Sequence, residues 1–173
     1  MCFIWLSTSF NFYLIQFLIN TFSQVYLSAL GSSISEILAY AFAGILYQVS
    51  GIKSSLFLSF GIAFLGGIAI LGYGLAHQND IIFPILVLVS KFGIACSFNI
   101  IYVSHSSVFP IAFAATALGF CNFFARVFSA TSPVLAQIEE PLPMIAFTLT
   151  SVTACVLALG IQTGTAPKQP TAE

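Results

Sequence analysis

The sequence predicts an all-α, polytopic membrane protein with six transmembrane helices, and three observations support this fold class. Only 5% of the 173 residues are charged and 59% are hydrophobic, whereas roughly a quarter of the residues in typical soluble domains are charged. The apolar residues form continuous windows close to the length of about 20 residues that a bilayer-spanning helix needs. The connections between windows are short, so we expect successive helices to be antiparallel neighbours in one bundle.

Six apolar windows follow one another, covering residues 2–22, 25–49, 55–76, 81–104, 110–135 and 142–162. Polar residues, glycine and proline cluster between them. The first window lacks the positively charged start of a secretory signal, so we interpret it as a retained span. Only the polar run NTFSQ separates it from the second window, which leaves a five-span interpretation open.

The orientation follows from the basic residues that flank the spans. With six spans, Lys53 and Lys168 lie on one side of the membrane, and Asp80, Glu139 and Glu140 lie on the other. We therefore expect both termini to be cytoplasmic.

Several function classes are not expected. The net charge is −1 and no basic run occurs, so we expect no nucleic-acid partner. The four cysteines form no CxxC pair and are predicted to be buried free thiols. His77 and His105 stand in loop-like polar surroundings and are predicted to be solvated or interfacial side chains. Neither a metal nor another cofactor is expected, and the absence of a catalytic constellation argues against an enzyme.

Three ionisable residues lie inside the apolar windows: Glu36, Lys91 and Arg126. Each charge costs about 2.5 to 3.5 kcal/mol at a helix centre unless it faces a partner or water. Glu36 and Lys91 either pair across neighbouring helices or have a functional role, and both interpretations stay open. Asn122 and Ser129 are spaced to lie on the same helical face as Arg126, as a water-lined cavity requires. We predict Arg126, Asn122, Lys91 and Glu36 as solute-binding residues.

The glycine-rich third window has a weaker signal. Its sequence LGYG, at residues 71–74, lacks the preceding Thr-Val of a potassium filter. We predict instead that the glycines allow close helix packing: Gly61, Gly66, Gly67, Gly72 and Gly74.

The stretch KFGIACSFNIIYV, residues 91–103, resembles the tenth-helix motif of the organic cation/anion transporter family within the major facilitator superfamily. The stretch CFIWLSTSFNFYL resembles helix seven, and YLSALGSSISEILAY resembles helix eight with its glutamate at Glu36. The resemblance covers nearly the whole chain. It includes four residues that have the same spacing as in the family's segment that runs through helix eleven: Pro110, Gly119, Arg126 and Pro133.

The resemblance implies the carboxy-terminal half of a twelve-helix carrier that works by alternating access around a central solute site. Residues 1–166 would form this six-helix half, and residues 167–173 a short cytoplasmic tail. An amino-terminal half that the chain lacks, or a second copy, would supply the rest of the cavity wall. The expected partners are the lipid bilayer and a small organic solute, and the plasma membrane is one candidate location.

The residue at the position of Arg126 differs within that family: members that handle organic anions tend to carry arginine there, and those that handle cations an acid. The resemblance therefore implies transport of organic anions. Physically, a guanidinium fork in a low-dielectric cavity orients a carboxylate, sulfate or phosphate group. By the same resemblance, Lys91 and Glu36 would be helix-packing or coupling charges.

Charges expected at the family's inner gate are replaced by neutral residues. Gln48, Val49 and Ile52 stand where Asp, Arg and Arg are expected, Ser107 replaces a glutamate, and Ala114 replaces an arginine. In such carriers these charges help to hold the gate shut. The alternative is therefore a truncated carrier fragment that does not transport and has a scaffold role or no activity.

Overall fold

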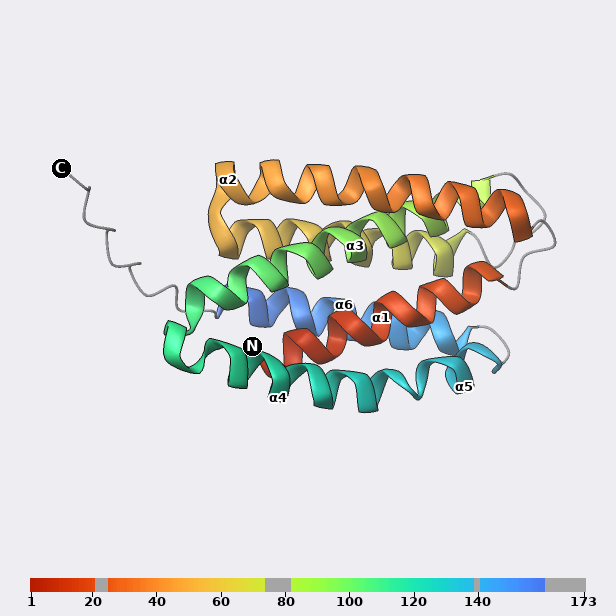
Figure 1. The fold of residues 1–173 in the computed structure, drawn as a ribbon. Helices are drawn as coiled ribbons and strands as arrows, with labels where there is room; N and C mark the ends of the chain where they lie inside the picture. The colour runs from red at the N-terminus through yellow and green to blue at the C-terminus, as the bar shows by residue number, and fades with distance from the viewer. Residues whose placement is uncertain (21–24, 74–81, 139–140, 161–173) are drawn as a thin grey trace.

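A computed structural model describes residues 1–20, 25–73, 82–138 and 141–160. All regular structure in this part of the chain is helical, which confirms the all-α, multi-pass prediction. The helices lie side by side along one long axis (Figure 1). They are α1 (Cys2–Asn20), α2 (Val25–Gly72), α3 (Ile82–Val108), α4 (Ile111–Ser129), α5 (Ser132–Ala136) and α6 (Leu142–Leu159).

Helix α2 contains two of the predicted spans. Gly51 has φ 71° and ψ 178°, and α2 turns back there into two antiparallel arms, residues 25–50 and 52–72 (Figure 1). This backbone conformation is essentially restricted to glycine. Across the turn, the Ser55 hydroxyl donates to the carbonyl oxygens of Leu46 at 2.9 Å and Gly51 at 2.5 Å. A single-residue turn therefore separates the second and third windows, where the sequence predicted a short loop.

The fifth predicted window, residues 110–135, is divided into α4 and α5. Helix α4 ends at Ser129, and Pro133 lies in the first turn of α5, where a proline is tolerated because no intrahelical donor is lost. The Ser132 hydroxyl donates to the carbonyl oxygen of Phe10 at 3.2 Å, which holds α5 against α1. The fifth window is thus interrupted just before Pro133, where the sequence predicted one continuous span.

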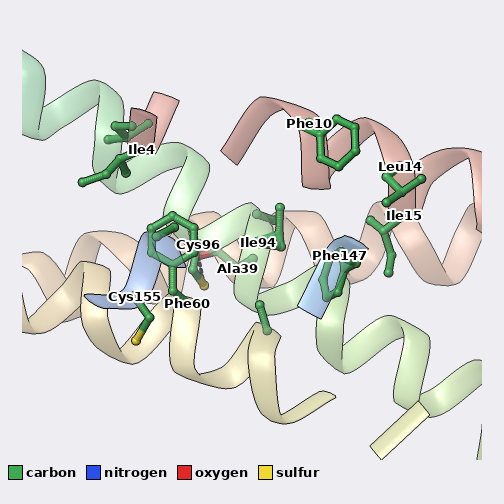
Figure 2. Packing of buried hydrophobic residues seen from close by; sticks show 14 of the residues in the cluster. Ile4, Phe10, Leu14, Ile15, Ala39, Phe60, Ile94, Cys96, Phe147 and Cys155 are labelled. Atoms are coloured by element: carbon green, nitrogen blue, oxygen red, sulfur yellow. Dashed lines mark hydrogen bonds between the residues drawn. The ribbon is translucent and has the colours of Figure 1, made fainter. Parts of the chain in front are cut away.

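The buried core draws on most of the bundle. Figure 2 shows part of it, to which α1, both arms of α2, α3 and α6 contribute. Members of this cluster include Leu14, Ala39, Phe60, Ile94 and Phe147. Large apolar side chains also cover the outer surface of the bundle, as in a protein whose solvent is lipid. Among the described residues, five helical stretches are long and apolar enough to cross a membrane, with α2 counted as one and α4–α5 as one.

The second arm of α2 packs closely against α3 at two glycines. A Cβ atom added to Gly93 would lie 2.6 Å from the backbone nitrogen of Ala63, and one added to Gly66 would lie 3.1 Å from Cα of Ser90. Neither position can take a larger side chain unless the backbones move apart. Such contacts between small residues are the usual means of bringing membrane helices together.

The predicted packing glycines divide into two groups. Gly66 is confirmed, as is Gly67, where an added Cβ would lie 2.7 Å from Oγ1 of Thr148 on α6. The prediction is wrong for Gly61 and Gly72, where an added Cβ meets nothing within 4 Å. Gly74 lies outside the described residues.

One end of the bundle holds the N-terminus, the turn at Gly51 and the connection between α3 and α4 (Figure 1). Lys53 follows the turn and lies at this end. The arrangement agrees with the predicted alternation of antiparallel spans. Asp80, Glu139, Glu140 and Lys168 lie outside the described residues, and a cytoplasmic position for this end remains a prediction.

Candidate solute-binding site

Lys91 of α3 is completely buried and is held by two other helices. From α1, Oε1 of Gln16 accepts a hydrogen bond from Nζ, and the ring centroid of Phe12 lies 5.4 Å from Nζ. From the first arm of α2, the Ser32 hydroxyl oxygen accepts a second hydrogen bond, and Oε2 of Glu36 lies 3.9 Å from Nζ. Lys91 therefore ties α1, α2 and α3 together.

The pairing of Lys91 with Glu36 confirms the interpretation that these charges pair across neighbouring helices. A buried cation is costly unless it is both paired and hydrogen-bonded, and Lys91 meets both conditions. The Glu36 side chain is 25% exposed and accepts a hydrogen bond from the Tyr40 hydroxyl at 3.2 Å. The lysine is thus inside the bundle, while the carboxylate lies at its rim.

Arg126 of α4 is exposed. Its Nη1 donates to the Tyr13 hydroxyl of α1, and its Cζ lies 5.4 Å from the Tyr13 ring centroid. Among the described residues, Glu36 is the one carboxylate, and it pairs with Lys91. Most of the five N–H donors of the guanidinium thus have no protein acceptor within the described part of the chain.

The other polar residues of this face of α4 differ from one another in burial. Asn122, one turn before Arg126, is partly buried. Ser129 is buried and donates its hydroxyl to the carbonyl oxygen of Ala125 in the same helix. Ser129 therefore adds no unpaired hydroxyl to the predicted polar face. A solute-binding role for Asn122 stays a prediction.

Two adjacent aromatic residues of α1 connect the two cations. The Phe12 ring, which lies near Lys91, and the Tyr13 ring, which contacts Arg126, have centroids 5.7 Å apart. The aromatic row continues along α3, with 5.0 Å between the centroids of Phe12 and Phe98. Both cations are therefore bordered by one set of aromatic rings.

Three α1 residues contact these cations and were not predicted from the sequence: Phe12, Tyr13 and Gln16. The first window has no charge, and its few polar residues are scattered among apolar ones. The one signal was the spacing of the polar groups of Tyr13 and Gln16, which are three residues apart and therefore lie on one helical face. The second arm of α2 and α6 provide none of the contacts to Lys91 or Arg126 described above.

Neutral contacts occupy the positions where the resemblance implied gate charges. The hydroxyls of Tyr47 and Ser107 lie 3.1 Å apart and join the first arm of α2 to the end of α3. The carbonyl oxygen of Ala114 lies 3.2 Å from Nε2 of His105. Hydrogen bonds between uncharged groups thus connect the helices at this end of the bundle.

The prediction that His105 is a solvated or interfacial loop residue is wrong. His105 lies within α3 and is only 2% exposed, and Nε1 of Trp5 donates to its Nδ1 at 3.3 Å. The neighbouring serines made this segment look like a loop, but both Ser106 and Ser107 donate to the carbonyl oxygen of Val103 in the same helix. Polar side chains satisfied in this way do not end a helix. His77 lies outside the described residues.

The four cysteines are unbridged, and three of them, Cys96, Cys121 and Cys155, are buried as predicted. The prediction of burial is wrong for Cys2, which is exposed. Its sulfur lies 2.7 Å from that of Cys121, so these thiols join the start of α1 to α4.

Comparison with known proteins gives similarity to transporters. The chain is 29% identical over 163 residues to the Caenorhabditis elegans protein named "Putative transporter B0252.3", covering 92% of this chain and 33% of that protein. It is 28% identical over 80 residues to "Putative transporter SVOPL" of Danio rerio, covering 46% and 16%. It is 26% identical over 86 residues to "Solute carrier family 22 member 15-like" of Xenopus tropicalis, covering 47% and 18%. No protein-family profile matches the chain.

The chain is similar to membrane transporters. This supports the transporter-level part of the resemblance, in a multi-pass protein of the bilayer. The matched segments span only a third or less of the length of these relatives.

Proposed function

We propose that this chain is the carboxy-terminal six-helix half of a secondary transporter for small organic anions, and that Arg126 receives the anionic group. The observation that carries this proposal is the state of Arg126. Its guanidinium is exposed and contacts only the neutral side chain of Tyr13 among the described residues. An arginine in a membrane helix that has no carboxylate partner in the described part of the chain is suited to bind an anion from outside the chain.

The aromatic row supports a solute with an apolar body. Phe12 and Phe98 are partly buried, and Tyr102, whose ring centroid lies 5.4 Å from that of Phe98, is 37% exposed. A carboxylate at Arg126 would place the rest of a small solute beside these rings. The preferred substrate class is therefore an aromatic or otherwise amphipathic organic anion.

The second wall of the solute pathway belongs to the same proposal. The similar proteins are longer than the segments they share with this chain. In a carrier with two halves, the solute site lies between them. An amino-terminal half, or a second copy of this chain, would face α1, α3 and α4.

Uptake into proteoliposomes tests the proposal. Labelled benzoate and benzyltrimethylammonium have similar apolar bodies and opposite charges. We expect uptake of benzoate, reduced about tenfold to a hundredfold by Arg126→Ala because a charge-assisted hydrogen bond contributes about 1.5 to 3 kcal/mol. Arg126→Glu should reverse the charge preference. Lys53→Ala is the matched control, since Lys53 lies at the bundle end and should leave uptake unchanged. Benzoate uptake that survives both Arg126 substitutions would refute the assigned role.

A second candidate is a carrier-derived protein that does not transport and serves as a scaffold. The neutral contact between Tyr47 and Ser107 favours it, because the resemblance implies gate charges in that region. Well-folded protein that takes up neither probe, but migrates with a partner in blue-native electrophoresis, would support the scaffold. A longer transcript that encodes six further upstream helices would support the carrier.

A further inference from the structure

His105 uses both of its ring nitrogens to connect three helices. The indole N–H of Trp5 on α1 can only donate, so Nδ1 of His105 accepts this hydrogen bond at 3.3 Å. The ring proton must then be on Nε2, which donates to the carbonyl oxygen of Ala114 in the first turn of α4 at 3.2 Å. This arrangement requires a neutral imidazole with one defined tautomer.

We infer that His105 is a proton-binding site and that protonation releases α1 from the connection between α3 and α4. An imidazolium carries an N–H on both nitrogens, so its Nδ1–H would point at the N–H of Trp5. Two opposed donors cannot share a hydrogen bond, and little water can enter because Trp5 is fully buried and His105 nearly so. Proton binding therefore favours a state in which Trp5 has moved away.

Within residues 1–20, 25–73, 82–138 and 141–160, no carboxylate lies at His105 to neutralise an imidazolium. The His105 ring centroid lies 4.5 Å from that of Phe109 and 6.1 Å from that of Trp5. The α-amino group of Met1, just before α1, is the charged group that acts on His105 and is a cation, and α4 provides the neutral carbonyl of Ala114. The nearest titratable group of α3 is the Tyr102 phenol, which packs against Trp5. Glu36 is the one carboxylate among the described residues, and it pairs with Lys91.

The site has a structural consequence further along α1. This helix carries Trp5 near its start and Tyr13 two turns later, and Tyr13 contacts Arg126 of α4. His105 thus controls one of the points at which α1 is attached to the α3–α4 pair. Proton binding at His105 and the contact between these helices do not require transport of any solute.

Trp5 is the only tryptophan of the chain, so its fluorescence reports directly on this contact. The protein in detergent micelles or nanodiscs would be titrated from pH 8 to pH 5. We expect a single one-proton transition below neutral pH, with a red-shifted emission and a greater quenching by acrylamide on the acid side. Both changes indicate that the buried indole has become accessible.

The variants assign the transition to one residue. His105→Gln provides an amide that can accept from Trp5 and donate to Ala114 without binding a proton, so the transition should be lost. His77→Gln removes the other of the two histidines and should retain it. If His105→Gln does not fold, His105→Asn serves the same purpose. Emission and quenching that do not change with pH in the unmodified chain, or a transition that persists without His105, would overturn the inference.

Discussion

Lys91 and Arg126 are both cations inside predicted spans, but they have opposite environments in the structure. Lys91 is fully buried and has two hydrogen-bond acceptors, a carboxylate and an aromatic ring around its ammonium. Arg126 is exposed, and among the residues that the structure describes its guanidinium interacts with the neutral side chain of Tyr13. The presence of a charged residue in a membrane helix therefore does not by itself reveal the role of that residue. The number of protein partners within the described part of the chain distinguishes a charge that the fold holds in place from one that we propose is available to a solute.

The largest effect on stability is expected for Lys91→Ala. It removes a buried cation, leaves Gln16 and Ser32 without their donor, and leaves Glu36 unpaired. Breaking a buried pair costs roughly 3 to 5 kcal/mol, and we expect about 3 kcal/mol because Glu36 is partly exposed. Thermal unfolding in detergent, followed by circular dichroism, measures the change. Arg126→Ala is the control and should leave the melting temperature unchanged. An equal loss of stability in both variants would remove the distinction between the two sites.

Gly93→Ala tests the support of the Lys91 site. The added Cβ would lie 2.6 Å from the backbone nitrogen of Ala63, so α3 must shift away from the second arm of α2. We expect a destabilisation of about 1 to 3 kcal/mol, the usual cost of overpacking. Gly119→Ala on α4, the helix of Arg126, is the matched control because an added Cβ there meets nothing within 4 Å. If the two variants melt alike, α3 is less constrained than its contacts indicate.

Glu36→Gln separates the ion pair from the hydrogen bonds of Lys91. The amide oxygen can still accept from Tyr40, and Lys91 keeps Gln16 and Ser32 as acceptors. Because the carboxylate is partly exposed and 3.9 Å away, we expect a loss of about 1 kcal/mol or less in the same melting experiment. A loss as large as that of Lys91→Ala would mean that the carboxylate, rather than the neutral acceptors, holds the lysine.

The smallest effect is expected for Tyr13→Phe, which removes the hydroxyl that accepts from Arg126. Stability should not change measurably. Losing one hydrogen bond changes binding by about 0.5 to 1.5 kcal/mol, so the KM for benzoate should change by about twofold to tenfold. Tyr47→Phe is the control, because it removes a tyrosine hydroxyl from the contact with Ser107 and leaves the Arg126 contact intact. Identical KM values for both variants and the unmodified chain would show that Tyr13 does not position Arg126.

The sequence predicted the helices well because lipid imposes a simple requirement. Every spanning segment must be apolar over about 20 residues, so the windows and breaks are visible without knowledge of the fold. The pairing of Glu36 with Lys91 was one of the two interpretations that the sequence left open, since two opposite charges in neighbouring apolar helices can stabilise each other. The break between the second and third spans was placed correctly around Gly51, although its form as a one-residue turn was not foreseen.

The partners of the charges could not be predicted, because their side chains look ordinary in the sequence. Gln16 and Tyr13 are single polar groups within an apolar window, and only the packing of α1 against α3 and α4 gives them a role. His105 was misassigned for the opposite reason. Its serine-rich neighbours suggested a loop, but those hydroxyls bond to their own helix, and Trp5 from α1 buries the imidazole.

The turn at Gly51 also determines the membrane topology of everything that follows it. A straight α2 of 48 residues would be about 72 Å long at 1.5 Å per residue, more than twice the bilayer core of about 30 Å. With the turn, the same residues cross the membrane twice. Helix α2 then ends on the side of the membrane where it began, and α3 starts from that side. The dihedral angles of one residue therefore set the number of crossings, and with it the side of the membrane on which each later helix begins and ends.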